Sequence, residues 1–328
     1  MTKRILFVCG SMNQTTQMHQ IARCLTEYKQ AFTPHFADGL LEFLRRRDRL
    51  EFTILGNRIT SRCREYLRAE SLLIDERGRG GLEKPYDLVV TCTDVIVQKS
   101  IRRSRLILVQ EGITDPEDRH FRLVQRCRWL PRWIAGTAAT GLSDKYVRFC
   151  VASEGYRDLF IGKGARPEKI VVTGIPNFDN CERYRCNTFA HRSYVLVCTS
   201  PLREILRGED RVAFIRRAVT IAAGRPMIFK FHPSENFARA SAEVQQHAPG
   251  SLIFTRGSAE EMIANCDVLI TRFSSTVFVG LALGKETYSD FPMQEMRRLL
   301  PVQNNAAAQN IAAVCRQVIE SGEQGVPA

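Results

Sequence analysis

Short runs of aliphatic and β-branched residues recur along the chain between longer mixed segments, and this rhythm constrains the fold most. In the first half the runs cover residues 4–9, 51–55, 87–91, 105–109, 147–152 and 169–173. Most are nearly continuous in Val, Ile and Leu, which is typical of parallel strands buried on both faces. The intervening lengths suit crossover helices, one of them over residues 15–28, so the pattern predicts an α/β fold.

The rhythm breaks over residues 174–193 and then restarts. Further strands are expected at 194–198, 227–231, 252–255, 268–271 and 287–289, with helices at 210–223, 234–247, 258–265, 275–283 and 310–321. A chain of 328 residues is long enough for two domains. We predict two doubly wound domains, residues 1–175 and 176–328, with the final helix able to pack back on the first. Ligands of such sheets bind outside the carboxyl ends of the strands, so two facing domains would hold a ligand in a cleft.

Composition excludes several classes of protein. No apolar run approaches the roughly 18 residues of a membrane span, and the start of the chain is typical of a strand rather than a signal peptide. The 11 cysteines include no CxxC pair, so we expect neither a disulfide framework nor a metal site, and we expect the reducing cytosol.

The net charge of +12 is unevenly distributed. Residues 1–175 carry 30 basic and 20 acidic residues, against 17 and 15 in the remainder. An excess in one half predicts an anionic partner for that half, for which nucleic acid, anionic lipid and acidic glycan all qualify. The alternative is a generally basic surface.

Two strand ends in the second half carry groups suited to a phosphate. Lys230, His232 and Pro233 follow one strand, where the His can donate to a phosphate and the Pro suits the first turn of a helix. After residues 268–271, a Ser would cap the next helix, whose open N–H groups attract anions. The predicted nucleotide-binding set is Ser200, Lys230, His232, Pro233, Arg272, Ser274, Ser275 and Thr276. The alternatives are a surface His in a turn and a plain helix cap.

Glu111 and Gly112 follow a strand of the first domain. A carboxylate at that point could take the proton of an acceptor hydroxyl, so Glu111 is the candidate general base. Asp115 and Asp118 are competitors, and a turn-capping acid is the alternative.

The loop after the first strand offers hydrogen-bonding groups. Gly10 allows a tight turn, and Asn13, Gln14 and Thr15 could bind a sugar acceptor, although a polar loop that caps a helix explains them equally well. The loop lacks the GxGxxG dinucleotide fingerprint.

Arginines alternate with aromatic residues over 119–133. This mixture suits an interfacial helix on anionic lipid, to which the basic run at 45–49 could add. The alternative is a solvated basic helix whose aromatic residues are core. No recognised nucleic-acid motif is present.

These motifs resemble those of a known group of enzymes. The layout is similar to that of GT-B glycosyltransferases, and the Glu-Gly, His-Pro and Ser-Ser pairs resemble motifs of bacterial sialyltransferases and polysialyltransferases, Kdo transferases and CDP-glycerol glycerophosphotransferases. The resemblance implies that Glu111 is the general base, and that His232-Pro233 and Ser274-Ser275 hold a cytidine nucleotide's phosphate. Gln110 stands where many sialyltransferases have a second acid, which leaves the sugar open.

The sequence thus predicts a cytoplasmic GT-B glycosyltransferase, with a peripheral position on the membrane's inner face as a further expectation. It would move a sugar from a CMP- or CDP-linked donor to a glycan or lipid-linked acceptor in surface polysaccharide synthesis. The catalytic residues would be Glu111 and His232, and no metal, other cofactor or nucleic acid is expected. Alternatives are a UDP-sugar transferase, a non-hydrolysing UDP-GlcNAc 2-epimerase, and a degenerate module that binds nucleotide or glycan.

Overall fold

The computed structural model describes residues 2–51, 53–127, 129–204 and 208–321. The chain divides into two compact units, the first formed by Met1–Asp179 with Asn304–Ala328 and the second by Asn180–Gln303. Helix α12 (Ala307–Glu320) therefore belongs to the first unit, although it comes last in the chain.

Unit 1 contains a six-stranded sheet whose strands are all parallel. The strands are β1 (Arg4–Cys9), β2 (Lys29–Pro34), β3 (Leu88–Thr91), β4 (Leu106–Val109), β5 (Arg148–Val151) and β6 (Ile170–Val172). Their order is β2-β1-β3-β4-β5-β6. The direction in which strands are added reverses between β1 and β3, which is where doubly wound sheets bind ligands.

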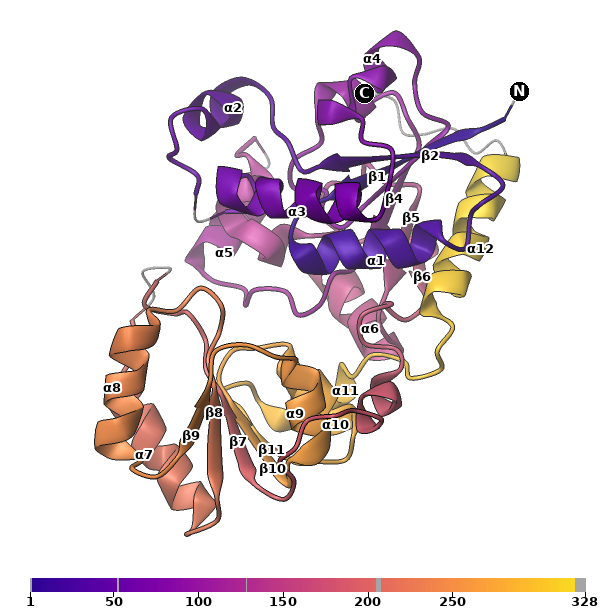
Figure 1. Ribbon diagram of the computed structural model, residues 1–328. Helices are drawn as coiled ribbons and strands as arrows, with labels where there is room; N and C mark the ends of the chain where they lie inside the picture. The colour runs from indigo at the N-terminus through magenta and orange to yellow at the C-terminus, as the bar shows by residue number, and fades with distance from the viewer. Residues whose placement is uncertain (1, 52, 128, 205–207, 322–328) are drawn as a thin grey trace. The chain divides into compact units, whose positions relative to one another are not determined.

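Among the residues that the structure describes, the α-helices of unit 1 are α1 (Met12–Ala22), α2 (Gly39–Arg45), α3 (Asn57–Ala69), α4 (Gly80–Glu83), α5 (Arg119–Arg126), α6 (Glu154–Lys163) and α12. Short 3₁₀ helices occur at Glu76–Gly78, Lys99–Ile101, Arg132–Ala139 and Pro167–Lys169. Figure 1 shows α1 lying against the sheet between α3 and α12. Ile5 and Phe7 of β1, Met18 of α1, and Ile311 and Cys315 of α12 share one core.

Unit 2 contains a parallel five-stranded sheet. Its strands are β7 (Val195–Cys198), β8 (Met227–Lys230), β9 (Leu252–Phe254), β10 (Val268–Thr271) and β11 (Glu286–Tyr288), in the order β11-β10-β7-β8-β9. Helices α7 (Arg211–Ala222) and α8 (Phe237–His247) lie on one side and α9 (Ala259–Asn265) and α10 (Thr276–Ala282) on the other (Figure 1). Helix α11 (Met293–Arg298) and a 3₁₀ helix at Cys181–Arg185 complete the unit. In this sheet, the direction in which strands are added reverses between β7 and β10.

One predicted strand is wrong and one real strand was not predicted. Residues 51–55 form turns, apart from Phe52, which lies outside the described residues. The second strand is instead Lys29–Pro34, whose sequence KQAFTP has no continuous apolar run. Such a sequence is compatible with its position at the edge of the sheet. The expected helix over 15–28 is also displaced, since α1 begins at Met12 and ends at Ala22.

Candidate functional site

Glu111 lies at the carboxyl edge of the unit 1 sheet, directly beyond β4. One carboxylate oxygen accepts a hydrogen bond from Ser11 Oγ and the other from Gln14 Nε2, both at 2.6 Å. Each oxygen keeps a further lone pair, because a carboxylate can accept about four hydrogen bonds. The group is therefore fixed in direction and still able to accept a proton.

The turn from β1 into α1 is what places the two donors on Glu111. Ser11 caps α1 by accepting the backbone N–H of Gln14 at 3.2 Å. Gly10 leaves room for the Gln14 side chain, since a Cβ at that position would lie 2.0 Å from Gln14 Oε1 and would displace it. Gly10 and Gln14 thus belong to the support of Glu111, a role that the sequence did not suggest.

The other two residues of the expected acceptor loop differ in position. Thr15 is fully buried and its hydroxyl donates to the carbonyl of Ser11, within the first turn of the helix. Asn13 is exposed, and its carbonyl accepts from Asn177 Nδ2 at 2.8 Å. Asn13 therefore presents its side chain at the surface of the unit, whereas Thr15 does not.

Gln110, the departure from the sialyltransferase pattern, has a structural explanation. Its side-chain oxygen accepts from the backbone N–H of Ala152 and its amide nitrogen donates to the carbonyl of Gly112. A carboxylate could not make the second bond, because an ionised acid only accepts. Gln110 joins β5 to the loop that carries Glu111.

The two competing acids are held in different ways. Asp118 caps α5, accepting from the backbone of His120 and Phe121 and from the His120 ring. These bonds lower the pKa of Asp118. Asp115 accepts from Thr137 Oγ1 at 2.7 Å and lines the same pocket as Glu111.

A pocket of about 660 Å³ opens beside Glu111, wholly within unit 1. Its exposed surface is mostly apolar. The lining comes from α1, the residue after β2, α2, the turns before α3, the loop after β3, and the segment from Gln110 to Thr140. Gln14, Thr93, Asp115, His35 and Glu111 are among its polar lining. A volume of this size suits a small organic ligand.

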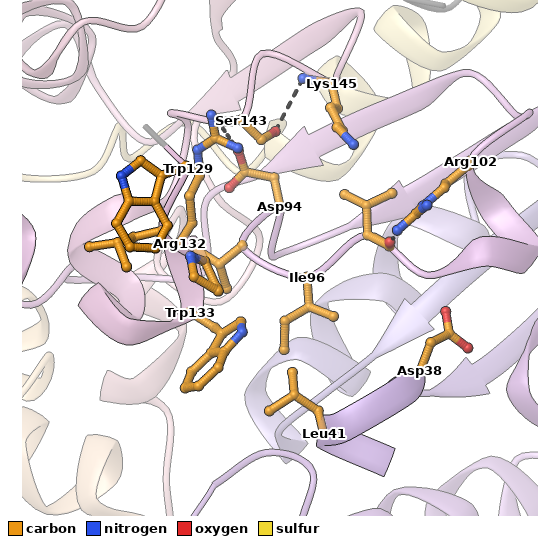
Figure 2. A pocket seen from close by; sticks show the side chains of 14 residues that line it. Asp38, Leu41, Asp94, Ile96, Arg102, Trp129, Arg132, Trp133, Ser143 and Lys145 are labelled. Carbon is orange, nitrogen blue, oxygen red and sulfur yellow. Dashed lines mark hydrogen bonds between the residues drawn. The ribbon is translucent and has the colours of Figure 1, made fainter. Parts of the chain in front are cut away.

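A second pocket, of about 370 Å³, shares Leu41, Val95, Ile96 and Trp133 with the first. Figure 2 shows Trp133 with Ile96 and Leu41 on one side of this pocket and the charged residues Asp38 and Arg102 on another. Arg132, Lys145 and Trp129 also line it. A part of the basic, aromatic segment that the sequence singled out thus lies around a pocket.

That segment is divided between core and surface. Phe121 is buried in a small cluster with Val124, whereas Trp129 is 82% exposed and Trp133 40% exposed. Arg128 lies outside the described residues. The basic run at 45–49 is partly neutralised, because Glu42 pairs with Arg45, Arg46 and Arg77 and its pKa is lowered to about 2, mainly by the hydrogen bond from Arg45.

In unit 2, the ends of β7, β8 and β10 lie side by side, with Cys198 in register with both Lys230 and Thr271. This alignment brings Ser200, His232 and Arg272 to one edge of the sheet. Ser200 is buried, and its carbonyl accepts from Arg211.

His232 is exposed at this edge and Lys230 is buried beneath it. The His232 ring accepts the backbone N–H of Ser234 at Nδ1, 3.2 Å away, which leaves the ring proton on Nε2. Desolvation and the nearby Lys230 charge lower the pKa of His232, so the ring is a neutral donor at pH 7. Lys230 Nζ donates to the carbonyl of Phe231, and burial lowers its pKa. Pro233 is exposed beside His232.

Arg272 is already bonded to two carboxylates. Its guanidinium contacts Asp290 at 2.6 Å and Glu209 at 3.2 Å, and Glu209 also pairs with the buried Arg211. Arg211 also forms a salt bridge with Glu235. Glu235 in turn accepts hydrogen bonds from Thr199 Oγ1 and from the backbone N–H of His232. This ion-pair network, not foreseen from the sequence, fixes the loops at the three strand ends.

The hydroxyl cluster after β10 only partly matches the expected cap. Ser275 occupies the cap position of α10 without a side-chain bond, whereas Ser274 Oγ accepts from the backbone N–H of Thr276. Thr276 Oγ1 also donates to Ser274 Oγ. The helix has seven residues.

Within the described ranges, no group of three or more His, Cys, Asp or Glu side chains could hold a metal ion. No helix in those ranges is long and apolar enough to cross a membrane.

Comparison with known proteins supports the fold. No family of known proteins matches the sequence, and no curated protein does so either. Solved structures are similar over almost the whole chain. The wall teichoic acid polymerase TagF, soaked with CDPG, is 11% identical with a TM-score of 0.51, covering 98% of this chain and 89% of that one.

Two further structures extend the comparison. HepE from Anabaena, in complex with UDP and glucose, is 13% identical with a TM-score of 0.53, covering 97% of this chain and 98% of its own. A UDP-N-acetylglucosamine 2-epimerase is 13% identical with a TM-score of 0.53, covering 97% and 88%. The chain has a GT-B fold. The predicted fold class, two parallel α/β domains of this type, is confirmed.

Proposed function

We propose that this protein is a glycosyltransferase that uses a nucleotide-activated donor. The observation that carries the proposal is Glu111, held by two donors at the mouth of a ligand-sized pocket, on a fold shared with proteins whose structures contain UDP, glucose or CDPG. A binding module has no need of a carboxylate oriented in this way. The residue assignments below are part of the proposal.

In this reaction the acceptor binds to unit 1 and its hydroxyl proton passes to Glu111. The acceptor oxygen attacks the anomeric carbon of the donor sugar, and the bond from that carbon to the phosphate oxygen breaks. The electron pair leaves with the nucleotide, whose phosphate gains negative charge. His232 Nε2–H and the hydroxyl of Ser274 would donate to that phosphate, while Thr276 donates its hydroxyl proton to Ser274 Oγ.

Lys230 and Arg272 have supporting parts in this scheme. Lys230 is buried and bonded to a neighbouring carbonyl, so it acts on the phosphate through its charge rather than by contact. Arg272 is bound by Asp290 and Glu209, so it orders the loop that presents Ser274. Ser200 joins β7 to Arg211 through its carbonyl.

We propose a cytidine nucleotide, CMP or CDP, as the donor's carrier. The His-Pro and Ser-Ser pairs support it through their resemblance to cytidine-dependent transferases, and the CDPG soak of TagF supports it by analogy. A UDP-linked donor is the competing assignment, because HepE contains UDP and an epimerase of UDP-N-acetylglucosamine shares the fold. A place in surface polysaccharide synthesis and a cytoplasmic, membrane-associated location remain parts of this proposal.

Thermal unfolding of the whole chain with CMP, CDP, UMP, UDP and GDP tests the donor. We expect CMP or CDP to raise the unfolding temperature most, and EDTA to leave that increase unchanged. An equal or larger increase with UDP would contradict the cytidine assignment and favour a UDP-sugar transferase or epimerase. No increase with any nucleotide would contradict the proposed function as a whole.

A further inference from the structure

His35 is a buried polar residue in the wall of the Glu111 pocket that the proposed mechanism does not use. It follows β2 directly, is 2% exposed, and lines the 660 Å³ pocket together with Glu111. Its Nε2 atom has no hydrogen-bond partner among the described residues. A core histidine normally has both ring nitrogens satisfied, because burying an unpaired polar atom is costly.

The surroundings of the ring determine which nitrogen carries the proton. Gln98 Nε2 lies 3.4 Å from His35 Nδ1 and donates to the carbonyl of Phe36 at 2.6 Å. Because the amide nitrogen is a donor, Nδ1 is the acceptor and the proton of the neutral ring lies on Nε2. Burial lowers the pKa of His35 to about 4, so the ring is neutral at pH 7. The unsatisfied atom is therefore an N–H donor.

The remaining walls define the rest of the ligand. Leu41, Leu44, Ile96, Ile113 and Ile134 all line the pocket, and Trp133 lies among them. Of the 24 described residues that line the pocket, 11 are polar, but most of its exposed surface is apolar. Among the polar groups, Glu111 accepts a hydrogen bond and His35 donates one. A free sugar would leave this aliphatic surface uncovered, whereas a molecule with an apolar body and an oxygen-bearing head would cover it and satisfy both polar groups.

We propose that the acceptor is an amphipathic alcohol, whose apolar alkyl or prenyl-like body lies in the unit 1 pocket and whose oxygen-bearing head accepts a hydrogen bond from His35 Nε2. This inference rests on the proposed function only in calling the ligand an acceptor. The pocket and the class of its ligand can be tested without turnover. His35 is then a specificity-determining residue, since it selects a head with an acceptor oxygen.

The chain's only two tryptophans provide a direct readout. Trp133 lines the pocket, whereas Trp129 lines only the second, smaller one. We would titrate the full-length protein with methyl, butyl and hexyl β-D-glucoside, below their micelle concentrations, and follow tryptophan fluorescence. Affinity should rise roughly fourfold for each added methylene that is buried. The signal should disappear in Trp133→Phe and persist in Trp129→Phe.

Three variants distinguish the contribution of the ligand's polar head to binding from that of its apolar body. His35→Phe keeps a ring of similar size without the N–H and should weaken binding of every glucoside by the same factor, roughly fivefold. His35→Gln restores a donor and should recover most of that loss. Leu44→Ala should leave methyl glucoside unchanged and reduce the gain with chain length.

The outcomes distinguish this inference from the function proposed above. If affinity does not depend on chain length, or if Trp133→Phe keeps the signal, the apolar ligand class is wrong even when nucleotides bind. If chain length matters but His35→Phe and His35→Gln behave alike, the assignment of His35 is wrong. If glucosides bind as expected while no nucleotide binds, the pocket is correctly assigned and the transferase is not.

Discussion

The two units of this protein have similar sheets but chemically different strand edges. In unit 1 the edge beside the reversal of strand order opens into a pocket whose exposed surface is mostly apolar and whose polar groups include Glu111 and His35. In unit 2 the corresponding edge is crossed by an ion-pair network that runs through Glu235, Arg211 and Glu209. A mostly apolar pocket suits an organic body, and a polar edge with hydrogen-bond donors suits a phosphate. Under the proposed function, one sheet topology would serve two ligands of opposite character.

Replacement of Glu111 should have the largest effect. Glu111→Gln keeps the hydrogen bond from Ser11, and the amide of Gln14 can rotate to satisfy the new group. Turnover should fall by roughly 10²-fold or more, since a general base is lost, while nucleotide affinity stays at the wild-type value. Turnover is measured as nucleotide release from the donor, and nucleotide affinity is measured by calorimetry.

Wild-type turnover by Glu111→Gln would show that the base is elsewhere. Asp115→Asn is then the variant to examine, because Asp115 lines the same pocket. Asp118→Asn is the matched control, since Asp118 caps α5 and should affect stability more than chemistry.

The reverse pattern is expected for unit 2. His232→Ala removes a neutral donor from the proposed phosphate site, so nucleotide affinity should fall by roughly tenfold or more, as for a hydrogen bond to a charged group. Binding of hexyl glucoside to unit 1 should not change. His247→Ala, at the end of α8, is the control within the same unit. Unchanged nucleotide affinity in His232→Ala would contradict the proposed phosphate site at this edge of unit 2.

Gly10→Ala tests the support of Glu111. The new Cβ would lie 2.0 Å from Gln14 Oε1 and must displace that side chain, so Glu111 loses one of its two donors. We expect turnover to fall by about tenfold with little change in nucleotide affinity. Gly162→Ala in α6 is the matched control, because nothing lies within 4 Å of its added carbon. Equal turnover in the two variants would mean that Gln14 does not position Glu111.

How far these features follow from the sequence differs between the two edges. The parallel strands, Glu111 and His232 could be predicted, because apolar runs and the residues directly after them are visible in one dimension. His35 could not, since β2 is an edge strand without an apolar run. The sequence predicts a strand over residues 51–55, whereas residues 53–55 line the pocket. The sequence places Arg272 in the nucleotide-binding set, and it does not reveal the ion pair with Glu209, which is distant along the chain.

The buried His35 also makes stability depend on pH. Its pKa falls from 6.5 to about 4 on folding, so between these values the unfolded chain binds a proton that the folded chain does not. Stability should therefore decrease as pH falls from 6.5 toward 4, by up to about 2 kcal/mol at pH 5 from this group. Urea unfolding at pH 7.5 and 5 should show a smaller decrease for His35→Phe than for the wild type. An identical decrease would mean that His35 is not buried as a neutral ring.

Membrane attraction should have the smallest effect. Arg122 and Arg126 are exposed on α5 of the basic unit, and each residue near an anionic surface contributes on the order of 1 kcal/mol, screened by salt. We expect sedimentation with anionic but not zwitterionic vesicles at low salt, reduced when both arginines are replaced by Glu. Replacing Arg216 and Arg256 of unit 2 is the control. Absence of anionic binding at low salt would favour a freely soluble acceptor.

Hydrogen exchange of the full-length protein, measured with CMP alone and with hexyl glucoside alone, tests the division between the two edges most directly. The account predicts that CMP slows exchange after β7, β8 and β10, around residues 199–200, 231–235 and 272–276. Hexyl glucoside should slow exchange around residues 35–44, 92–96 and 111–114. Protection of the unit 1 pocket by CMP, with no protection at the strand ends of unit 2, would contradict the assignment of nucleotide to one unit and acceptor to the other.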